Sequence, residues 1–279
     1  MDNFTTTKPP RLSIEAKAGT VSIETVDGTR TTVDITPLDD HDVTLDALLA
    51  TTVDQRGDDV FVHVPGRFSI RGRSPKLVIT ISTPHDARLS VKTDSADVVA
   101  TGRFGTSQVE SGSGDLTLGD FSDSLRVSAG SGDVRVESVA KDIVAKTGSG
   151  DVDVVDVDGD ASITSGSGDI VVGGASHGLV AKTGSGNITV GSAPPDLRIT
   201  TASGDIRVDV VAEGEVRAKA ASGDIYVGVQ RGTAAWLDVH TASGRVASAL
   251  DATDEPATGD RKVRLQLSTA SGDIELARV

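Results

Sequence analysis

The tripeptide Ser-Gly-Asp recurs at a constant spacing through most of the chain, and this repeat restricts the possible folds more than any other feature. Its serine stands at Ser113, Ser131, Ser149, Ser167, Ser185, Ser203, Ser222, Ser243 and Ser271, with Asn187 and Arg245 in place of the aspartate in two copies. The first six of these serines are separated by five equal intervals of 18 residues, and the later intervals are 19, 21 and 28 residues. A degenerate copy, Ser95-Ala96-Asp97, lies one more such step upstream. Self-similarity at a fixed period is typical of architectures that stack similar units.

Within each repeat, aliphatic residues occupy the sixth and fourth positions before the serine and the third and fifth positions after it. In the copy at Ser203 these residues are Leu197, Ile199, Ile206 and Val208. The residues between them are mostly polar or charged, so the alternation has a period of two. It predicts two short strands per repeat, each with one buried face. Because aromatic residues make up only 3% of the chain, the core is expected to consist of small, branched side chains.

Equal columns at every eighteenth position favour an all-β fold, a single-stranded β-helix or β-solenoid in which each turn lies over the last. One repeat cannot bury its own apolar face, so neighbouring turns must stack. The alternative is an antiparallel meander of hairpins, which needs tight turns at both ends of each strand pair. The second connection of each repeat varies and is long for such a turn, which favours the solenoid.

The chain is expected to form one domain with irregular ends. Residues 1–88 are interpreted as irregular N-terminal turns and a cap, residues 89–228 as the regular repeats, and residues 229–279 as irregular C-terminal turns and a cap. Strand-like runs in the first region lie at Leu12–Ala16, Val21–Val26, Thr31–Ile35, Val60–Val64 and Leu77–Ser82, and a short helix is expected over Val43–Ala50. The last copy, Ser271–Leu276, stands close to the end of the chain. Its strand is therefore expected to be an open edge that can pair with another copy.

Several turns resemble those of a known bacterial family. The turns Thr147–Val152, Thr183–Ile188 and Thr201–Ile206, together with the segment Gly232–Val239, are similar to β-strand-repeat proteins known as putative adhesins, whose function is unknown. The resemblance covers the chain from about residue 11 to its end. It implies a right-handed single-stranded β-helix. Because the first residues show no export signal, the chain looks more like the intracellular actinobacterial members of the family.

Composition excludes several classes of function. A net charge of −14 argues against a broad nucleic-acid surface, which needs clustered lysine and arginine. The absence of cysteine excludes disulfides, a thiolate nucleophile and cysteine-type zinc sites. No run approaches the ~20 apolar residues that span a bilayer. We therefore expect a soluble, cytoplasmic protein without a membrane span.

The aspartates that end the tripeptides allow two interpretations. As metal ligands, the candidates are Asp115, Asp133, Asp151, Asp169, Asp205 and Asp224. Calcium-binding solenoids, however, use Gly-Gly-x-Gly-x-Asp, whereas here the aspartate directly follows the glycine. As turn residues, the carboxylates accept hydrogen bonds from backbone N–H groups, and Asn187 fits that role equally well. The turn interpretation is favoured, and neither a metal nor a cofactor is expected.

The candidate interaction residues are a basic patch and the single tryptophan. The patch comprises Arg67, Arg71, Arg73 and Lys76 around Phe68, and it is suited to an acidic partner, including another copy of this acidic chain; Trp236 lies in the irregular C-terminal part. A further group, Asp142, Asp156, Asp158 and Asp160, is the feature that a carbohydrate-active enzyme would use. Such enzymes need two carboxyl groups in a cleft, and a solvated acidic edge is the favoured interpretation.

The sequence therefore predicts a non-catalytic structural or interaction module, a rigid solenoid that displays polar faces to a protein partner. One alternative is a self-assembling scaffold that forms homo-oligomers or polymers through its terminal strand edges, because head-to-tail pairing that does not close gives filaments. The other alternative is a carbohydrate-active β-helix enzyme. A concentration-dependent mass would distinguish the scaffold, and a deep groove with paired carboxyl groups would distinguish the enzyme.

Overall fold

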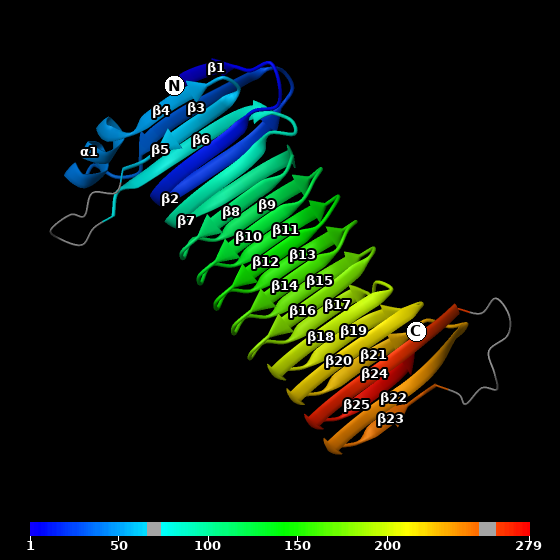
Figure 1. Ribbon diagram of the computed structural model, residues 1–279. Helices are drawn as coiled ribbons and strands as arrows, with labels where there is room; N and C mark the ends of the chain where they lie inside the picture. The colour runs from blue at the N-terminus through cyan, green and yellow to red at the C-terminus, as the bar shows by residue number, and fades with distance from the viewer. Residues whose placement is uncertain (66–73, 251–260) are drawn as a thin grey trace. The chain divides into compact units, whose positions relative to one another are not determined.

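The computed structural model of the chain describes residues 1–65, 74–250 and 261–279 (Figure 1). Strands dominate these residues, and α1 (Asp42–Ala50) is the one α-helix among them. The chain divides into two compact units, Met1–Lys141 and Asp142–Val279, which we call unit 1 and unit 2. The expected all-β fold and the short helix are both confirmed.

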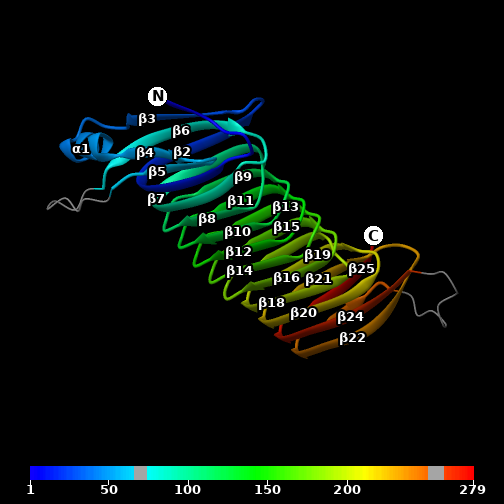
Figure 2. The same cartoon turned by 45° about the horizontal axis from the view of Figure 1, so that its top comes forward.

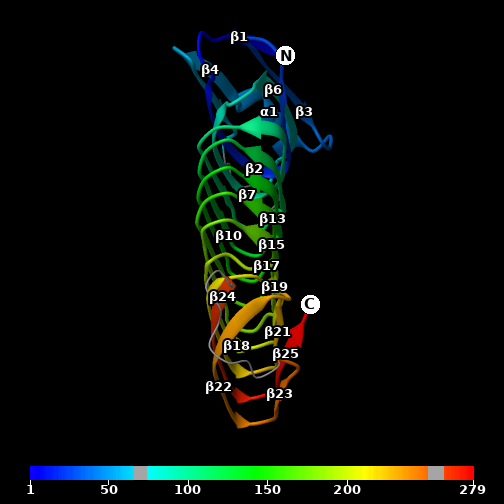
Figure 3. The ribbon, with the colours of Figure 1, turned by 90° about the vertical axis from the view of Figure 1, so that its right-hand side faces the viewer.

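Unit 2 consists of coils, each of which contributes one strand to each of two parallel sheets (Figure 3). The strands of the first sheet are β12 (Ile143–Thr147), β14 (Ala161–Ser165), β16 (Gly178–Thr183), β18 (Asp196–Ser203), β20 (Gly214–Ser222), β22 (Thr233–Ser243) and β24 (Arg261–Ser271). The strands of the second sheet are β13 (Val152–Val157), β15 (Ile170–Ala175), β17 (Ile188–Ser192), β19 (Ile206–Val211), β21 (Ile225–Val229), β23 (Val246–Ser248) and β25 (Ile274–Arg278). The Ser-Gly-Asp turns join the two strands of each coil.

Neighbouring strands of unit 2 pair in parallel and in the register of the repeat. Ile143 lies opposite Ala161, Ala161 opposite Leu179, and Leu179 opposite Leu197, so each pair is one repeat apart in the sequence. A meander of hairpins would have paired these strands antiparallel. The parallel register therefore confirms the β-helix solenoid.

Burial follows the alternation along each strand. In β15, Ile170 and Val172 are fully buried, whereas the intervening Val171 is 42% exposed. The side chains that point inward from the two sheets form the core of the coils. Each coil is too thin to bury these residues alone, so the apolar contacts between successive coils stabilise the stack.

The second glycine of a regular turn is required by the close approach of the next coil. A Cβ atom on Gly168 would lie 2.0 Å from the carbonyl oxygen of Gly150, which belongs to the same turn one coil earlier. Backbone atoms cannot move aside as a side chain would. Glycine at this corner is what allows the coils to stack at the usual distance of about 4.8 Å between strands.

Unit 1 is built around two long strands that each turn through both sheets. Its strands are β1 (Asp2–Thr5), β2 (Arg11–Val26), β3 (Arg30–Pro37), β4 (Thr52–Arg56), β5 (Asp59–His63), β6 (Lys76–Pro84), β7 (Arg88–Phe104), β8 (Ser107–Ser111), β9 (Leu116–Phe121), β10 (Leu125–Ala129) and β11 (Val134–Val139). Strands β2 and β7 pair in parallel from Arg11 opposite Arg88 to Glu24 opposite Thr101. The two expected runs Leu12–Ala16 and Val21–Val26 are thus halves of the single strand β2.

The outer end of unit 1 is closed by antiparallel strands. Strands β5 and β6 pair in parallel with β2, on the side away from β7. Strand β4 then pairs antiparallel with β5, β3 with β6, and β1 with β3. Antiparallel strands cannot continue the parallel coil, so they end it.

The last coil in the sequence is not the last coil in space. Strands β24 and β25 lie between β20/β21 on one side and β22/β23 on the other, with parallel pairing to both (Figure 1). The strand around Ile274–Leu276, expected to be an open edge, is therefore interior, and that prediction is wrong. After β21 the chain first forms β22 and β23, and then forms β24 and β25 between them and β20/β21. The outermost coil of unit 2 is therefore formed by β22 and β23.

Candidate functional site: the interaction surfaces of unit 2

The aspartates of the turns form a ladder of hydrogen bonds along the coils. In unit 2, Oδ1 of Asp151 accepts a hydrogen bond from the backbone N–H of Asp169 at 2.8 Å, and Oδ1 of Asp169 accepts one from the N–H of Asn187 at 2.7 Å. The ladder continues through Asp205 and Asp224 in the same manner, and in unit 1 Asp97, Asp115 and Asp133 are linked likewise. Five of the metal-ligand candidates are thus placed as acceptors that hold successive turns together: Asp115, Asp151, Asp169, Asp205 and Asp224.

The ladder ends at Arg245, one of the two residues that replace the aspartate of the Ser-Gly-Asp pattern. Asp273 accepts a hydrogen bond from the backbone N–H of Arg245 at 2.8 Å. Arginine has no side-chain acceptor with which to serve a further turn. Arg245 belongs to the outermost coil, where no further turn of the described chain follows. Sequence reasoning missed that this coil is the last in space, and the replacement of aspartate by Arg245 is the signal from which it could have been found.

The acidic group on the variable connection is also engaged with the backbone. Oδ1 of Asp142 accepts a hydrogen bond from the N–H of Asp160 at 3.0 Å, and Oδ1 of Asp160 accepts one from the N–H of Gly178 at 2.9 Å. These two carboxylates form a second, shorter ladder. They hold the connections of three successive coils, which is a structural role.

Most of the predicted basic patch falls outside the described residues. Arg67, Phe68, Arg71 and Arg73 lie there. Lys76 is the first residue of β6 in unit 1 and is exposed. Its backbone N–H donates a hydrogen bond to Oγ1 of Thr44 in α1 at 3.3 Å, which ties the helix to the sheet.

The two sheets of unit 2 carry opposite net charge, a feature that sequence reasoning missed. The seven strands of the first sheet contain eight lysines and arginines and three carboxylates, a net charge of +5. The seven strands of the second sheet contain two arginines and four carboxylates, a net charge of −2. In a chain of net charge −14, the first sheet is a basic surface.

Three lysines align on the outer surface of the first sheet, which we call the lysine face. Lys146 lies opposite Thr164, which lies opposite Lys182; Thr200 then separates Lys182 from Lys219. All five side chains are exposed. The lysines stand two coils apart, about 10 Å, and none of the three forms an ion pair with a described residue. Their charges are therefore available to a partner.

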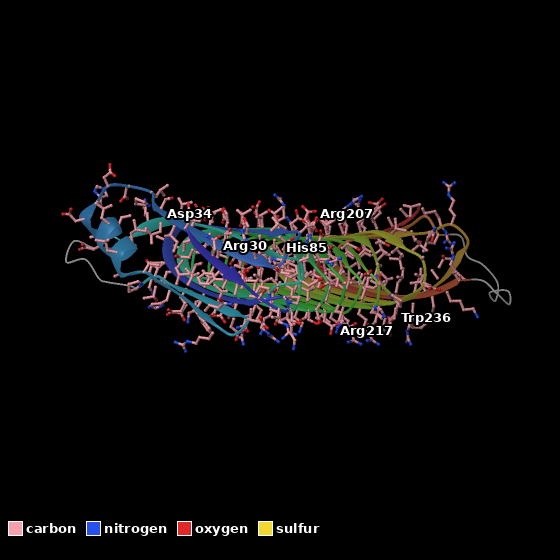
Figure 4. All side chains as sticks on the ribbon, turned by 90° about the horizontal axis from the view of Figure 1, so that it is seen from above. Arg30, Asp34, His85, Arg207, Arg217 and Trp236 are labelled. Atoms are coloured by element: carbon pink, nitrogen blue, oxygen red, sulfur yellow. The ribbon has the colours of Figure 1, made fainter. Side chains whose placement is uncertain are left out.

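The arginines of the same sheet are held by neighbours. Arg217 contacts Glu215 at 2.7 Å and Gln266 at 2.9 Å, and Arg198 contacts Asp196 at 2.9 Å. Figure 4 shows Arg217 and Trp236 on one side of unit 2 and Arg207, from the second sheet, on the other. These pairs orient the arginines on the surface, whereas the lysines next to them remain unpaired.

Trp236 lies at the end of the lysine face, on the outermost strand β22. Its side chain is 53% exposed, and the guanidinium carbon of Arg264 lies 4.2 Å from the ring centroid. Arg264 comes from β24, the neighbouring strand, and covers one face of the ring as a cation–π partner. Leu237, which follows Trp236 and faces inward, is 40% exposed because no described strand covers it.

Among the described residues, no group of three or more histidine, cysteine, aspartate or glutamate side chains is placed to hold a metal ion. In the same part of the chain, no helix has the length and apolar character to cross a membrane.

The parallel coils define the protein as a β-helix solenoid, and comparison with known proteins gives its family. The model of the Toastrack family (DUF4097) matches residues 10–194 and 122–277. The chain therefore belongs to the Toastrack DUF4097 family. No curated protein matches it.

Three solved structures are similar to the chain. A putative adhesin from Bacteroides fragilis has 18% identity and a TM-score of 0.51, with 74% of this chain and 95% of that one covered. A putative adhesin from Parabacteroides distasonis has 11% identity and a TM-score of 0.41, with 98% and 95% covered. A putative cell adhesion protein from Clostridium sporogenes has 9% identity and a TM-score of 0.21, with 100% and 98% covered. The first of these shows a shared fold, and the resemblance to the putative-adhesin family is confirmed.

Proposed function

We propose that this protein is a non-catalytic interaction module and that the lysine face of unit 2 binds an acidic protein partner. The observation that supports this proposal is the row Lys146, Lys182 and Lys219, which is unpaired and lies on a sheet of net charge +5 in an acidic chain. The sheet holds the backbones of the three lysines in a line, so binding needs no ordering of this backbone. The description of a structure of shared fold as a putative adhesin is consistent with an interaction role.

The spacing of the lysines favours an acidic polypeptide over a nucleic acid. Duplex DNA carries one negative charge per ≈ 1.7 Å of axis, far denser than one lysine per about 10 Å along the coils. The carboxylates of the turn ladder, such as Asp169 and Asp205, flank the lysine face and would repel a wide polyanion. An extended acidic segment is narrow enough to follow the row alone.

The proposal is tested with poly-L-glutamate as the probe, by isothermal titration calorimetry at low and at moderate salt. We expect binding by the full chain that weakens as salt rises, since exposed charges are screened. The variant K146Q/K182Q/K219Q should bind at least tenfold more weakly. The control V155E/V171E/T189E changes the net charge by the same −3 on exposed or half-buried positions of the second sheet, away from the lysine face, and should bind like the natural chain.

Two outcomes would overturn the proposal. If both triple variants lost binding equally, only the total charge would matter and the lysine face would have no special role. If a duplex oligonucleotide bound more tightly than poly-L-glutamate, the partner would be a nucleic acid and not an acidic protein.

A further inference from the structure

The outermost coil of unit 2, formed by β22 and β23, is an unpaired edge. We call this coil the terminal edge. Both strands pair with β24 and β25 on one side, and no described strand pairs with them on the other (Figure 2). A strand with free backbone N–H and C=O groups is a template for pairing with another chain.

The core is open at the terminal edge. Leu237 and Val246 are 40% and 48% exposed, whereas Leu265 and Ile274, which occupy the same columns one coil inward, are fully buried. With Trp236 they place three large apolar side chains at the end of the coils. Covering this exposed apolar surface with another surface would lower the free energy, because the side chains would leave water.

The terminal edge also lacks the features that protect natural edge strands. Residues 233–250 contain Asp238 and Arg245 but no lysine, glutamate or proline, so their net charge is zero. Charged residues make up 24% of the whole chain, and their scarcity here resembles the composition of interface centres, where charge is depleted and tryptophan enriched. A neutral segment allows two copies of an acidic chain to approach without repulsion at the contact.

Arg245 decides how a second copy can pair. Every interior turn of the ladder in unit 2 offers a side-chain oxygen to the backbone N–H of the next turn, and Arg245 offers none. A parallel coil added to the terminal edge would therefore leave that N–H without its acceptor. An antiparallel strand has no such turn at this place, and the same edge from a second copy supplies one through a twofold axis.

We infer that the protein forms a closed dimer in which β22 of one copy pairs antiparallel with β22 of another. A register centred on Leu237 places this residue opposite its counterpart and Ala235 opposite Val239, so the inward columns of the two copies join into one core. It also places Trp236 opposite Asp238 and keeps the two Asp238 carboxylates from facing each other. This inference concerns a different surface from the lysine face and stands whether or not that face binds an acidic partner.

The inference is tested by light scattering of the full chain across a wide concentration range. We expect twice the chain mass of 28.5 kDa, with dissociation only on dilution. Leu237→Lys places a charge in the contact and should give a monomer at all concentrations. Val171→Lys, a similarly exposed apolar position on the second sheet, should leave the dimer intact, and circular dichroism should show both variants folded.

The register is tested by oxidation of a single-cysteine variant, because the chain has no cysteine of its own. Residues directly opposite each other on antiparallel strands are close enough for a disulfide. Leu237→Cys should form a covalent dimer and Val171→Cys should not. A monomeric natural chain, a mass that keeps rising with concentration, or a Leu237→Lys variant that remains dimeric would each overturn the inference.

Discussion

At the scale of single residues, the repeated aspartate acts through its acceptor oxygen more than through its charge. Asp169 accepts a hydrogen bond from the turn of the next coil, and Asn187, which has no charge, does the same for Asp205. At each turn, the ladder thus provides a side-chain acceptor for a backbone N–H that lies between the two strands and has no partner in either sheet. This role explains why an uncharged amide replaces the carboxylate at one position.

Removing one acceptor should weaken unit 2 by about 1 kcal/mol, the net contribution of a typical hydrogen bond. We expect Asp169→Ala to lower the free energy of unfolding by this amount in urea titrations followed by circular dichroism. Asp169→Asn removes the same charge but keeps the acceptor and should stay close to the natural protein. Equal destabilisation by both substitutions would show that the negative charge, and not the acceptor, is what matters.

At the scale of the element, the coil is set by two strands and the corner between them. Strands of five or six residues alternate inward aliphatic and outward polar side chains, and the corner brings two backbones into contact. The corner is the part with the least steric freedom, because a Cβ atom on Gly168 would overlap the carbonyl group of Gly150.

Gly168→Ala should therefore lower the thermal midpoint strongly, with a cost of about 2–3 kcal/mol as the coils shift to admit a methyl group. Gly174→Ala is the matched control in the same coil. Its Cβ atom would meet only Oδ1 of Asp156 at 3.5 Å, an ordinary contact. Differential scanning calorimetry of the two variants measures the difference. A tolerated alanine at both positions would mean that the coils are not packed as tightly at the corner as described.

At the scale of the whole molecule, chain order and spatial order differ at one end of each unit. In unit 1, β5 and β6 lie outside β2, although β7 follows them in the chain and lies inside. In unit 2, β22 and β23 lie outside β24 and β25. In both units the chain moves outward by one coil and then returns, so the outermost coil is not formed by the terminus itself.

Engineered cysteines test the order of the last coils. Tyr226 lies opposite Glu275, and Glu275 lies opposite Ala247, so Tyr226 and Ala247 are two coils apart. Adjacent strands are about 4.8 Å apart, within disulfide range, and two coils are about 9.6 Å apart, beyond it. We expect Y226C/E275C to form an intramolecular disulfide and Y226C/A247C to remain reduced, as read by mass spectrometry after oxidation. The reverse result would mean that the coils follow chain order.

Much of the fold was predictable from the sequence because its causes are local and repeated. The period of two defines which side chains face inward, and the constant interval between repeats aligns each column with itself. The acceptor role of the turn aspartates was also predictable, since it needs only the next turn in the stack. The helix over Val43–Ala50 is not part of the repeat, but its signal is also local, and it was predicted within one residue of α1.

The candidate surfaces depended on the tertiary structure. Copies of a repeat share the same columns, so the columns alone do not say whether β22 or β24 follows β20. Contacts between coils determine the order. In the β24/β25 coil, Leu267 is buried and Asp273 forms hydrogen bonds with the turns on both sides. In the β22/β23 coil, Arg245 offers no acceptor to a further turn. The row of Lys146, Lys182 and Lys219 follows from the period, because each stands three residues before its serine. The tertiary structure adds that their side chains are exposed and that the sheet around them carries a net positive charge. Sequence alone thus determined the strands, their register and the turns, and the tertiary structure determined which coil is outermost and what its surface presents.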